Sequence, residues 1–261
     1  MEISITKRLR AGEKLFGTWT EGSSPTNVEV LGMAGYDFVI IDNEHGCHAN
    51  PNFLHLIRAA EVRKIAPIIR VPGPDIEDHF KKALDMGASG VLVPNIYTKE
   101  DAEKCVRFSK FAPVGNRGCC PFLRSNYYGE KYGSIQYYSK SNEEVCTILL
   151  FETKEAVENI DDILSVPGID GVFIGPVDLS VSMGIPGEND NPKLVKTIEY
   201  IVEKAHQHGY PAGLFCESAE AVMKWINKVD FITNGYDIGV LLGAETALLK
   251  QFKEAAARGT K

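Results

Sequence analysis

Two acidic residues, Glu152 and Asp178, stand just beyond short apolar runs of the chain. Glu152 directly follows ILLF, and Asp178 comes two residues after the Gly-Pro pair that follows GVFI. Buried runs separated by helix-like stretches predict neighbouring strands of a parallel sheet, and in a closed barrel the carboxyl ends of the strands meet at one rim. Two carboxylates there predict a site for a hard divalent cation. Each alone also fits a structural role, Glu152 capping a helix start and Asp178 opening a turn.

The ends of the other predicted strands add more polar and ionisable side chains. They are Trp19 near the end of the first strand, Asp42 at the end of the second with Glu44 and His45 just beyond it, and Arg70 near the end of the third. Burying such a set together would cost several kcal/mol unless a metal or ligand balanced the charge, so the set predicts a catalytic site. Singly, His45 also fits a loop histidine, Arg70 an ion pair with Asp42 or Asp75, and Trp19 a plug in the barrel mouth.

These residue types fit carbon–carbon bond chemistry beside a ketone. A divalent ion on two carboxylates keeps open positions for a 2-oxo acid and stabilises negative charge on its keto oxygen. Arg70 can hold the same oxygen, and the turn formed by Gly175, Pro176, Val177 and Asp178 can bind the substrate carboxylate through its backbone N–H groups, of which Pro176 has none. His45 is then the expected proton shuttle.

Other chemistries fit this set less well. Zinc prefers His or Cys ligands, which the two carboxylates do not offer. A Schiff base needs a lysine, and strands five to seven contain none, since Lys154 lies just past Glu152 at a helix start. No GxGxxG motif follows the first strand, which argues against a dinucleotide such as NAD.

The elements that must position these residues alternate between strand and helix patterns along the whole chain. Eight such units fill 261 residues without a linker or composition break, which predicts one domain, 1–261, folded as a single (β/α)8 TIM barrel of the α/β class. The region 113–142 has glycines, tyrosines and no clean period, which predicts a long loop acting as a lid or a subunit contact.

Bulk composition excludes several classes of function. The net charge is −7 with no block of lysine or arginine, so nucleic acid is not an expected partner. No apolar run reaches the length of a membrane span, and the first residues lack the apolar core of a signal peptide. The six cysteines show no CxxC spacing, which is typical of reduced thiols in a cytoplasmic protein.

Seven stretches of the chain together resemble one family, the HpcH/HpaI class II pyruvate-dependent aldolases. They are GTWTEGSSP, GYDFVIIDNEHG, PIIRVP, KKALDMGASGVLVPN, PVGNRG, FETKEAVENIDDIL and GIDGVFIGPVDLS, spread over most of residues 17–184. The resemblance implies a pyruvate-type barrel that splits 4-hydroxy-2-oxo acids, including those from aromatic compound catabolism, into pyruvate and an aldehyde.

The same resemblance implies roles for particular residues. Glu152 and Asp178 would hold Mg²⁺ or Mn²⁺, with Co²⁺ as another option, and no PLP, NAD or Schiff-base lysine is implied. Arg70 would contact the pyruvyl oxygen, and His45 would act as acid/base paired with Asp85. Trp19 and Arg124 would line the site. The family typically forms homohexamers that exchange the terminal helix, here residues 238–257.

Departures from the family keep alternatives open. Leu150 stands where members often have glutamine, which puts one metal or water contact in doubt. An acyl-CoA lyase of the citrate lyase β-subunit type would need a basic surface, for which Arg117, Arg124 and Lys131 are candidates. A non-catalytic barrel that binds a metal or a 2-oxo acid is the third option. The aldehyde is also open: an acidic one would need a cation such as Arg124, and a hydrophobic one would suit the tyrosine-rich loop.

Overall fold

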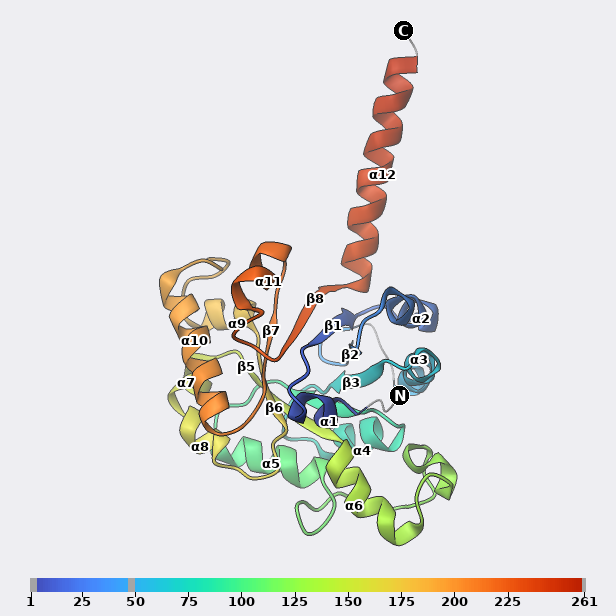
Figure 1. Cartoon of the computed structure of the whole chain (residues 1–261), viewed down its shortest axis with the longest axis vertical. Helices are drawn as coiled ribbons and strands as arrows, with labels where there is room; N and C mark the ends of the chain where they lie inside the picture. Colours follow the sequence, from blue (N-terminus) through green and yellow to red (C-terminus); the bar gives the residue numbers. More distant parts are fainter. Residues whose placement is uncertain (1–3, 47–49, 260–261) are drawn as a thin grey trace.

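Eight parallel strands close into a barrel in the order β1 to β8, with helices packed around it (Figure 1). The computed structural model describes residues 4–46 and 50–259. The strands are β1 (Leu15–Thr20), β2 (Phe38–Asp42), β3 (Ala66–Arg70), β4 (Gly90–Val93), β5 (Cys146–Phe151), β6 (Gly171–Ile174), β7 (Ala212–Phe215) and β8 (Phe231–Tyr236). This architecture confirms the predicted (β/α)8 barrel.

Helical segments alternate with the strands along the chain, and all but the last lie around the barrel. They are α1 (Ile5–Arg10), α2 (Pro25–Ala34), α3 (Asn50–Arg63), α4 (Glu77–Asp85), α5 (Lys99–Ser109), the 3₁₀ segment η1 (Arg124–Gly129), α6 (Ser134–Glu144), α7 (Lys154–Glu158), α8 (Ile160–Leu164), α9 (Pro176–Ser182), α10 (Pro192–Gln207), α11 (Ala219–Trp225) and α12 (Asp237–Gly259). No helix in the described ranges is long and apolar enough to cross a membrane.

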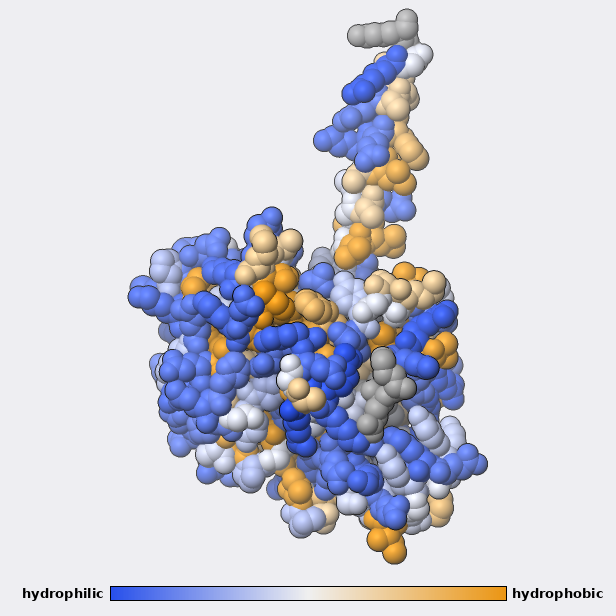
Figure 2. Space-filling model, viewed as in Figure 1, coloured by the Kyte–Doolittle hydropathy of each residue, from blue (hydrophilic) through white to orange (hydrophobic). Residues whose placement is uncertain are grey.

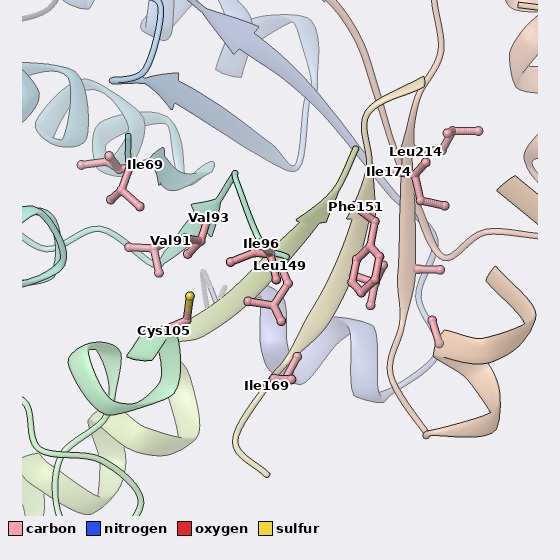
Figure 3. Packing of buried hydrophobic residues seen from close by; sticks show 14 of the residues in the cluster. Ile69, Val91, Val93, Ile96, Cys105, Leu149, Phe151, Ile169, Ile174 and Leu214 are labelled. Atoms are coloured by element: carbon pink, nitrogen blue, oxygen red, sulfur yellow. The ribbon is translucent and has the colours of Figure 1, made fainter. Parts of the chain in front are cut away.

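Side chains along each strand alternate between two apolar layers. One layer packs between the strands and the helices, and Figure 3 labels several of its members, including Ile69, Val91, Val93, Leu149 and Phe151. The other layer fills the barrel interior with the alternate residues, among them Phe38, Ile40, Ile68, Leu92, Ile148, Leu150 and Phe173. Because both layers are apolar, the strands appear in the sequence as continuous apolar runs.

The same alternation places the polar residues at the strand ends. Asp42 comes two residues after Ile40, Arg70 two after Ile68, and Glu152 two after Leu150. Side chains two apart on a strand share a face, so these three continue the interior layer where the apolar residues stop. They therefore project into the barrel at its carboxyl-terminal rim, and β2 and β3 pair Asp42 directly with Arg70.

The region predicted as a long loop, 113–142, contains more regular structure than its composition indicates. Its second half holds η1 and then α6, which buries Tyr137 against Phe111 with ring centroids 5.5 Å apart. Asn142 donates to the carbonyl of Phe111 and accepts from its N–H, which ties α6 to the end of α5. With only Tyr137 and Ser141 buried on α6, no apolar stripe marks this helix in the sequence.

Helix α12 projects away from the barrel, joined to it only at its base (Figure 1). At that base the Asp237 carboxylate accepts hydrogen bonds from the Thr20 hydroxyl at 2.9 Å and the Glu21 N–H at 3.0 Å. Beyond it the helix exposes apolar side chains, visible as an orange stripe in Figure 2: Ile238, Val240, Leu241, Leu242, Leu248, Leu249 and Phe252. Exposed apolar side chains gathered on one element in this way are uncommon on a folded domain.

Candidate active site

Arg70 and Asp42 form a bidentate ion pair on the inner side of the rim. Arg70 Nε and Nη2 lie 2.8 and 2.6 Å from the two carboxylate oxygens of Asp42, which is 0% exposed. Burial by itself raises the pKa of Asp42, but hydrogen bonds from Arg70 and from the backbone N–H groups of Glu44 and His45 outweigh it and lower that pKa. The ion pair between Arg70 and Asp42, which the sequence allowed as a structural role for Arg70, is therefore present.

Arg70 is also held by Trp19 and Glu44. Its guanidinium lies 4.7 Å from the Trp19 ring centroid, and Nη1 lies 3.1 Å from a Glu44 oxygen. Trp19 is fixed in turn, since its Nε1 donates to the hydroxyl of Thr233 at 2.9 Å. The contacts with Asp42 and Glu44 use three of the five N–H groups of the guanidinium, so the two others can still bind a ligand.

Glu152 lies at the centre of the rim and is only 7% exposed. Burial raises its pKa to about 7, with help from the nearby carboxylates of Glu44 and Asp178, although a hydrogen bond from the Asn95 N–H and the charge of Arg70 oppose the rise. The Asn95 bond is 3.0 Å long. Because burial penalises the ionised form, a positive charge placed beside this carboxylate would stabilise it.

The start of α9, at Gly175, brings the carboxylate of Asp178 to the part of the rim that holds Glu152. A Cβ built on Gly175 would lie 3.6 Å from a Glu152 carboxylate oxygen, so the start of α9 passes directly beside Glu152. Asp178 sits in the first turn of α9 and is exposed, rather than in the turn that the sequence suggested. Two carboxylates from successive strand ends therefore converge on the rim.

The donor set of Glu152 and Asp178 fits a hard divalent cation. Both side chains are carboxylates, and two protein ligands would leave the remaining positions of a six-coordinate ion to water and substrate. Among the described residues there is no group of three or more His, Cys, Asp or Glu side chains that could hold a metal without them. A cation between Glu152 and Asp178 would offset the repulsion that raises the Glu152 pKa. Mg²⁺ and Mn²⁺ suit such oxygen ligands.

Metal affinity is expected to fall below about pH 7, because the cation must displace the proton that Glu152 takes up there. For one competing proton, the Kd for Mn²⁺ rises roughly tenfold for each pH unit below that value. Titration of Mn²⁺ followed by electron paramagnetic resonance, at several values from about pH 5.5 to about pH 8, measures this dependence. If the affinity for Mn²⁺ stayed the same across that pH range, Glu152 would not be a ligand of the metal.

A pocket of about 290 Å³ opens at this rim. Its walls are Trp19, Glu21, Arg70, Leu150, Glu152, Phe173, Gly175, Pro176, Val177, Asp178, Phe215, Glu217, Gly235 and Tyr236. The structure thus brings Trp19, Arg70, Glu152 and the start of α9, residues 175–178, together around one cavity. Leu150, where a glutamine was expected by resemblance, gives part of the wall an apolar surface.

Three of the predicted site residues lie apart from this pocket. His45 has a side chain 71% exposed, with Nε2 3.7 Å from a Glu44 oxygen. Asp85 ends α4 and accepts from Arg117 Nη2 at 2.7 Å, while Arg124 pairs with Glu61 and donates to the Met86 carbonyl.

Asp85 and Arg124 are at the opposite end of the barrel. A pocket there is lined by Arg117 and Arg124 together with Pro67, Ser89 and Val145, which begin or precede strands β3, β4 and β5. The rim pocket lies instead where the strands end. One chain by itself therefore does not pair His45 with Asp85.

Several residues of the site were not among the sequence predictions. Asn95 holds Glu152 through its N–H and has a positive φ of 59°, while its side chain donates to Glu44 at 3.2 Å. Its position as the last residue of the fourth apolar run, GVLVPN, is the signal that could have found it. Glu21, Glu217 and Tyr236 also line the pocket, each just beyond or at the end of a strand.

The sequence of this chain is similar to those of known proteins. The family model for HpcH/HpaI aldolase/citrate lyase matches residues 15–244. The 5-keto-4-deoxy-D-glucarate aldolase of Escherichia coli O157:H7 is 33% identical, covering 94% of this chain and 95% of that protein.

Solved structures extend the likeness to the whole fold. The citrate synthase SbnG is 32% identical over 98% of this chain and 99% of its own, with a TM-score of 0.89. The HpcH/HpaI aldolase from Desulfitobacterium hafniense DCB-2 is 28% identical over 96% of this chain and 97% of its own, with a TM-score of 0.90. The chain belongs to the HpcH/HpaI aldolase/citrate lyase family.

Proposed function

We propose that this protein is a divalent-metal-dependent aldolase, a carbon–carbon lyase that reversibly splits a 4-hydroxy-2-oxo acid into pyruvate and an aldehyde. The observation that carries the proposal is the buried Glu152 carboxylate, with its pKa raised to about 7, beside Asp178 and within reach of the charge of Arg70. The aldolase names of the relatives support this function over an acyl-CoA lyase or a non-catalytic barrel.

Glu152 and Asp178 would hold Mg²⁺ or Mn²⁺. When bound, the ion would supply Lewis-acid stabilisation of negative charge on the keto oxygen of pyruvate. The two uncommitted N–H groups of Arg70 would donate to the same oxygen, and the pair with Asp42 fixes the direction in which they point. The first-turn N–H groups of Val177 and Asp178 have no partner within α9 and would bind the pyruvate carboxylate.

His45 would remove and return the proton on the methyl carbon of pyruvate. Its exposed position beyond the rim leaves it free to approach a substrate that fills the pocket. The proposed partner of His45 is Asp85, and the opposite placement of the two in one chain means that Asp85 would come from a second copy. Arg124 would likewise have to come from a second copy in order to contribute to the site.

Exchange of the pyruvate methyl protons with D2O, followed by NMR, tests the proposal without knowledge of the aldehyde. We expect exchange with added Mn²⁺ or Mg²⁺, none with chelator, and a loss of at least about a hundredfold in His45→Ala. Lys64→Ala, a surface change at the residue that follows α3, serves as the control. Metal-loaded protein that gives no exchange would refute the proposed function.

Assembly through α12 is expected, as the resemblance implies. Replacing Leu242 and Leu249 by aspartate puts two charges into the exposed apolar stripe, so we expect a smaller assembly of folded barrels. Light scattering after size exclusion gives the mass, and circular dichroism reports the fold. Lys250→Asp and Lys253→Asp place the same residue type on the same helix as a matched control. An unchanged mass in the leucine variant would contradict a role of α12 in assembly.

A further inference from the structure

Asn95 joins two rim carboxylates that have different partners. Its backbone N–H donates to Glu152 at 3.0 Å, and its side-chain Nδ2 donates to Oε1 of Glu44 at 3.2 Å. The other oxygen of Glu44 lies 3.1 Å from Arg70 Nη1. One residue therefore connects the arginine that would hold the keto oxygen with a carboxylate that would hold the metal. Asn95 itself is not among the described residues that line the rim pocket, so any effect it has on the reaction passes through these neighbours.

The backbone conformation of Asn95 makes both contacts possible. Strand β4 ends at Val93, and Asn95, two residues later, has a φ of 59°. Asparagine is one of the few residue types besides glycine that adopt this left-handed conformation readily. The N–H is directed to Glu152, while the side chain reaches Glu44 and the carbonyl of Pro72, which accepts from Nδ2 at 3.3 Å. The arrangement therefore needs both the positive φ and the amide.

Tyr97 fixes the direction in which the Asn95 amide points. Its hydroxyl donates to Asn95 Oδ1 at 3.2 Å, while the carboxylate and carbonyl oxygens beside Nδ2 can only accept. A flipped amide would place its own oxygen against those acceptors, so one orientation alone satisfies all three contacts. Tyr97 is itself anchored, because its N–H donates to Asp101 at 3.1 Å and its carbonyl accepts from Asn159 at 2.8 Å.

We infer that Asn95 is a positioning residue, which holds the Glu44 carboxylate in an arrangement that leaves Arg70 free for the substrate. Tyr97 acts through the Asn95 amide. This inference rests on the proposed function. With Oε1 held by Asn95, Glu44 offers only Oε2 to the guanidinium, and Asp42 takes Nε and Nη2. A released Glu44 can turn both oxygens onto Arg70 and so occupy an N–H group that the keto oxygen needs.

Asn95→Gly separates the two contacts of Asn95. Glycine keeps the positive φ and the N–H on Glu152, but it removes the amide that holds Glu44. We expect pyruvate proton exchange with Mn²⁺ to fall at least about tenfold, while the Kd for Mn²⁺, measured by electron paramagnetic resonance, changes by less than about threefold. Lys64→Gly is the matched control, since Lys64 is exposed, has the same φ of 59° and should leave both values unchanged. Exchange that does not fall, or that falls only as far as the Mn²⁺ affinity does, would overturn the inference.

Asn95→Asp distinguishes the amide donor from the shape of the side chain. Aspartate has nearly the same shape and tolerates a positive φ, but it places an acceptor against the oxygens of Glu44 and Pro72. We therefore expect proton exchange to fall at least as far as in Asn95→Gly. If Asn95→Asp retained more exchange than Asn95→Gly, the shape of the side chain and not its donor would matter, and the inference would be wrong.

Tyr97→Phe tests whether the hydroxyl acts through Asn95. We expect this change to lower exchange about threefold in the wild-type background and to have no effect in Asn95→Gly, which has no amide left to orient. Tyr200→Phe, which removes an exposed hydroxyl from α10, should change neither background. Equal losses from Tyr97→Phe in both backgrounds would refute its action through Asn95. Wild-type protein without any exchange would instead refute the proposed function itself.

Discussion

Replacing Glu152 by glutamine is expected to lower aldol turnover at least about a thousandfold and, at the same time, to stabilise the metal-free protein. Glutamine is close in shape and can still accept from the Asn95 N–H, but it no longer offers a charged ligand. The stability gain follows because a pKa raised to about 7 means that the ionised carboxylate is unfavourable in the folded state.

The sign of the pH dependence makes this prediction specific. Glu152 is ionised in the unfolded chain above about pH 4.5, but in the folded protein only above about pH 7. Its destabilising effect is therefore complete above about pH 7, shrinks as the pH falls through that range, and is gone below about pH 4.5. We expect Glu152→Gln to raise the free energy of unfolding by up to about 3 kcal/mol at pH 8 and by little at pH 5.

Urea unfolding with chelator present measures both values, and Glu155→Gln is the matched control on the surface of α7. Activity and stability should thus change in opposite directions in Glu152→Gln. A variant that is both inactive and less stable at about pH 8 would show that Glu152 is paired in the folded state rather than strained.

The barrel and its inner rim were predictable because both depend on local pattern. Continuous apolar runs separated by helical stretches predict parallel strands. Because every second side chain of a strand points to the same face, Asp42, Arg70 and Glu152 are expected on the face that fills the barrel interior. The sequence also allowed the ion pair of Asp42 with Arg70, because neighbouring strands end side by side. Each of these inferences needed only residues within a few positions of a strand end.

The features that the sequence did not predict depend on contacts between residues far apart in the chain. Helix α6 is held by the ring of Phe111 and by Asn142, and its own sequence has no apolar stripe to reveal it. Asp85 and Arg124 were carried over by resemblance alone, and their ion partners, Arg117 and Glu61, bind them at the opposite end of the barrel. Spacing along one chain cannot indicate a residue whose proposed role needs a second chain.

Removing Arg70 is expected to damage folding as well as catalysis. Arg70→Ala leaves Asp42, which is 0% exposed, without its bidentate partner, and breaking a buried pair in this way costs about 3–5 kcal/mol. Arg70→Lys keeps the charge but not the planar fork, so it should retain more stability while losing at least about a hundredfold in turnover. Denaturant unfolding and proton exchange measured on the same samples separate the two effects.

A double-mutant cycle tests whether the stability lost in Arg70→Ala comes from the unpaired carboxylate of Asp42. If it does, Asp42→Asn should recover much of the stability lost in Arg70→Ala, because the amide carries no charge to leave unpaired, and the coupling should reach a few kcal/mol. The penalty of Arg70→Ala should also shrink as the pH falls below about 5, since an unpaired buried Asp42 takes up a proton more readily than an exposed one. Additive losses, or a penalty independent of pH, would mean that Trp19 packing on the guanidinium, and not the charge pair, holds Arg70 in place.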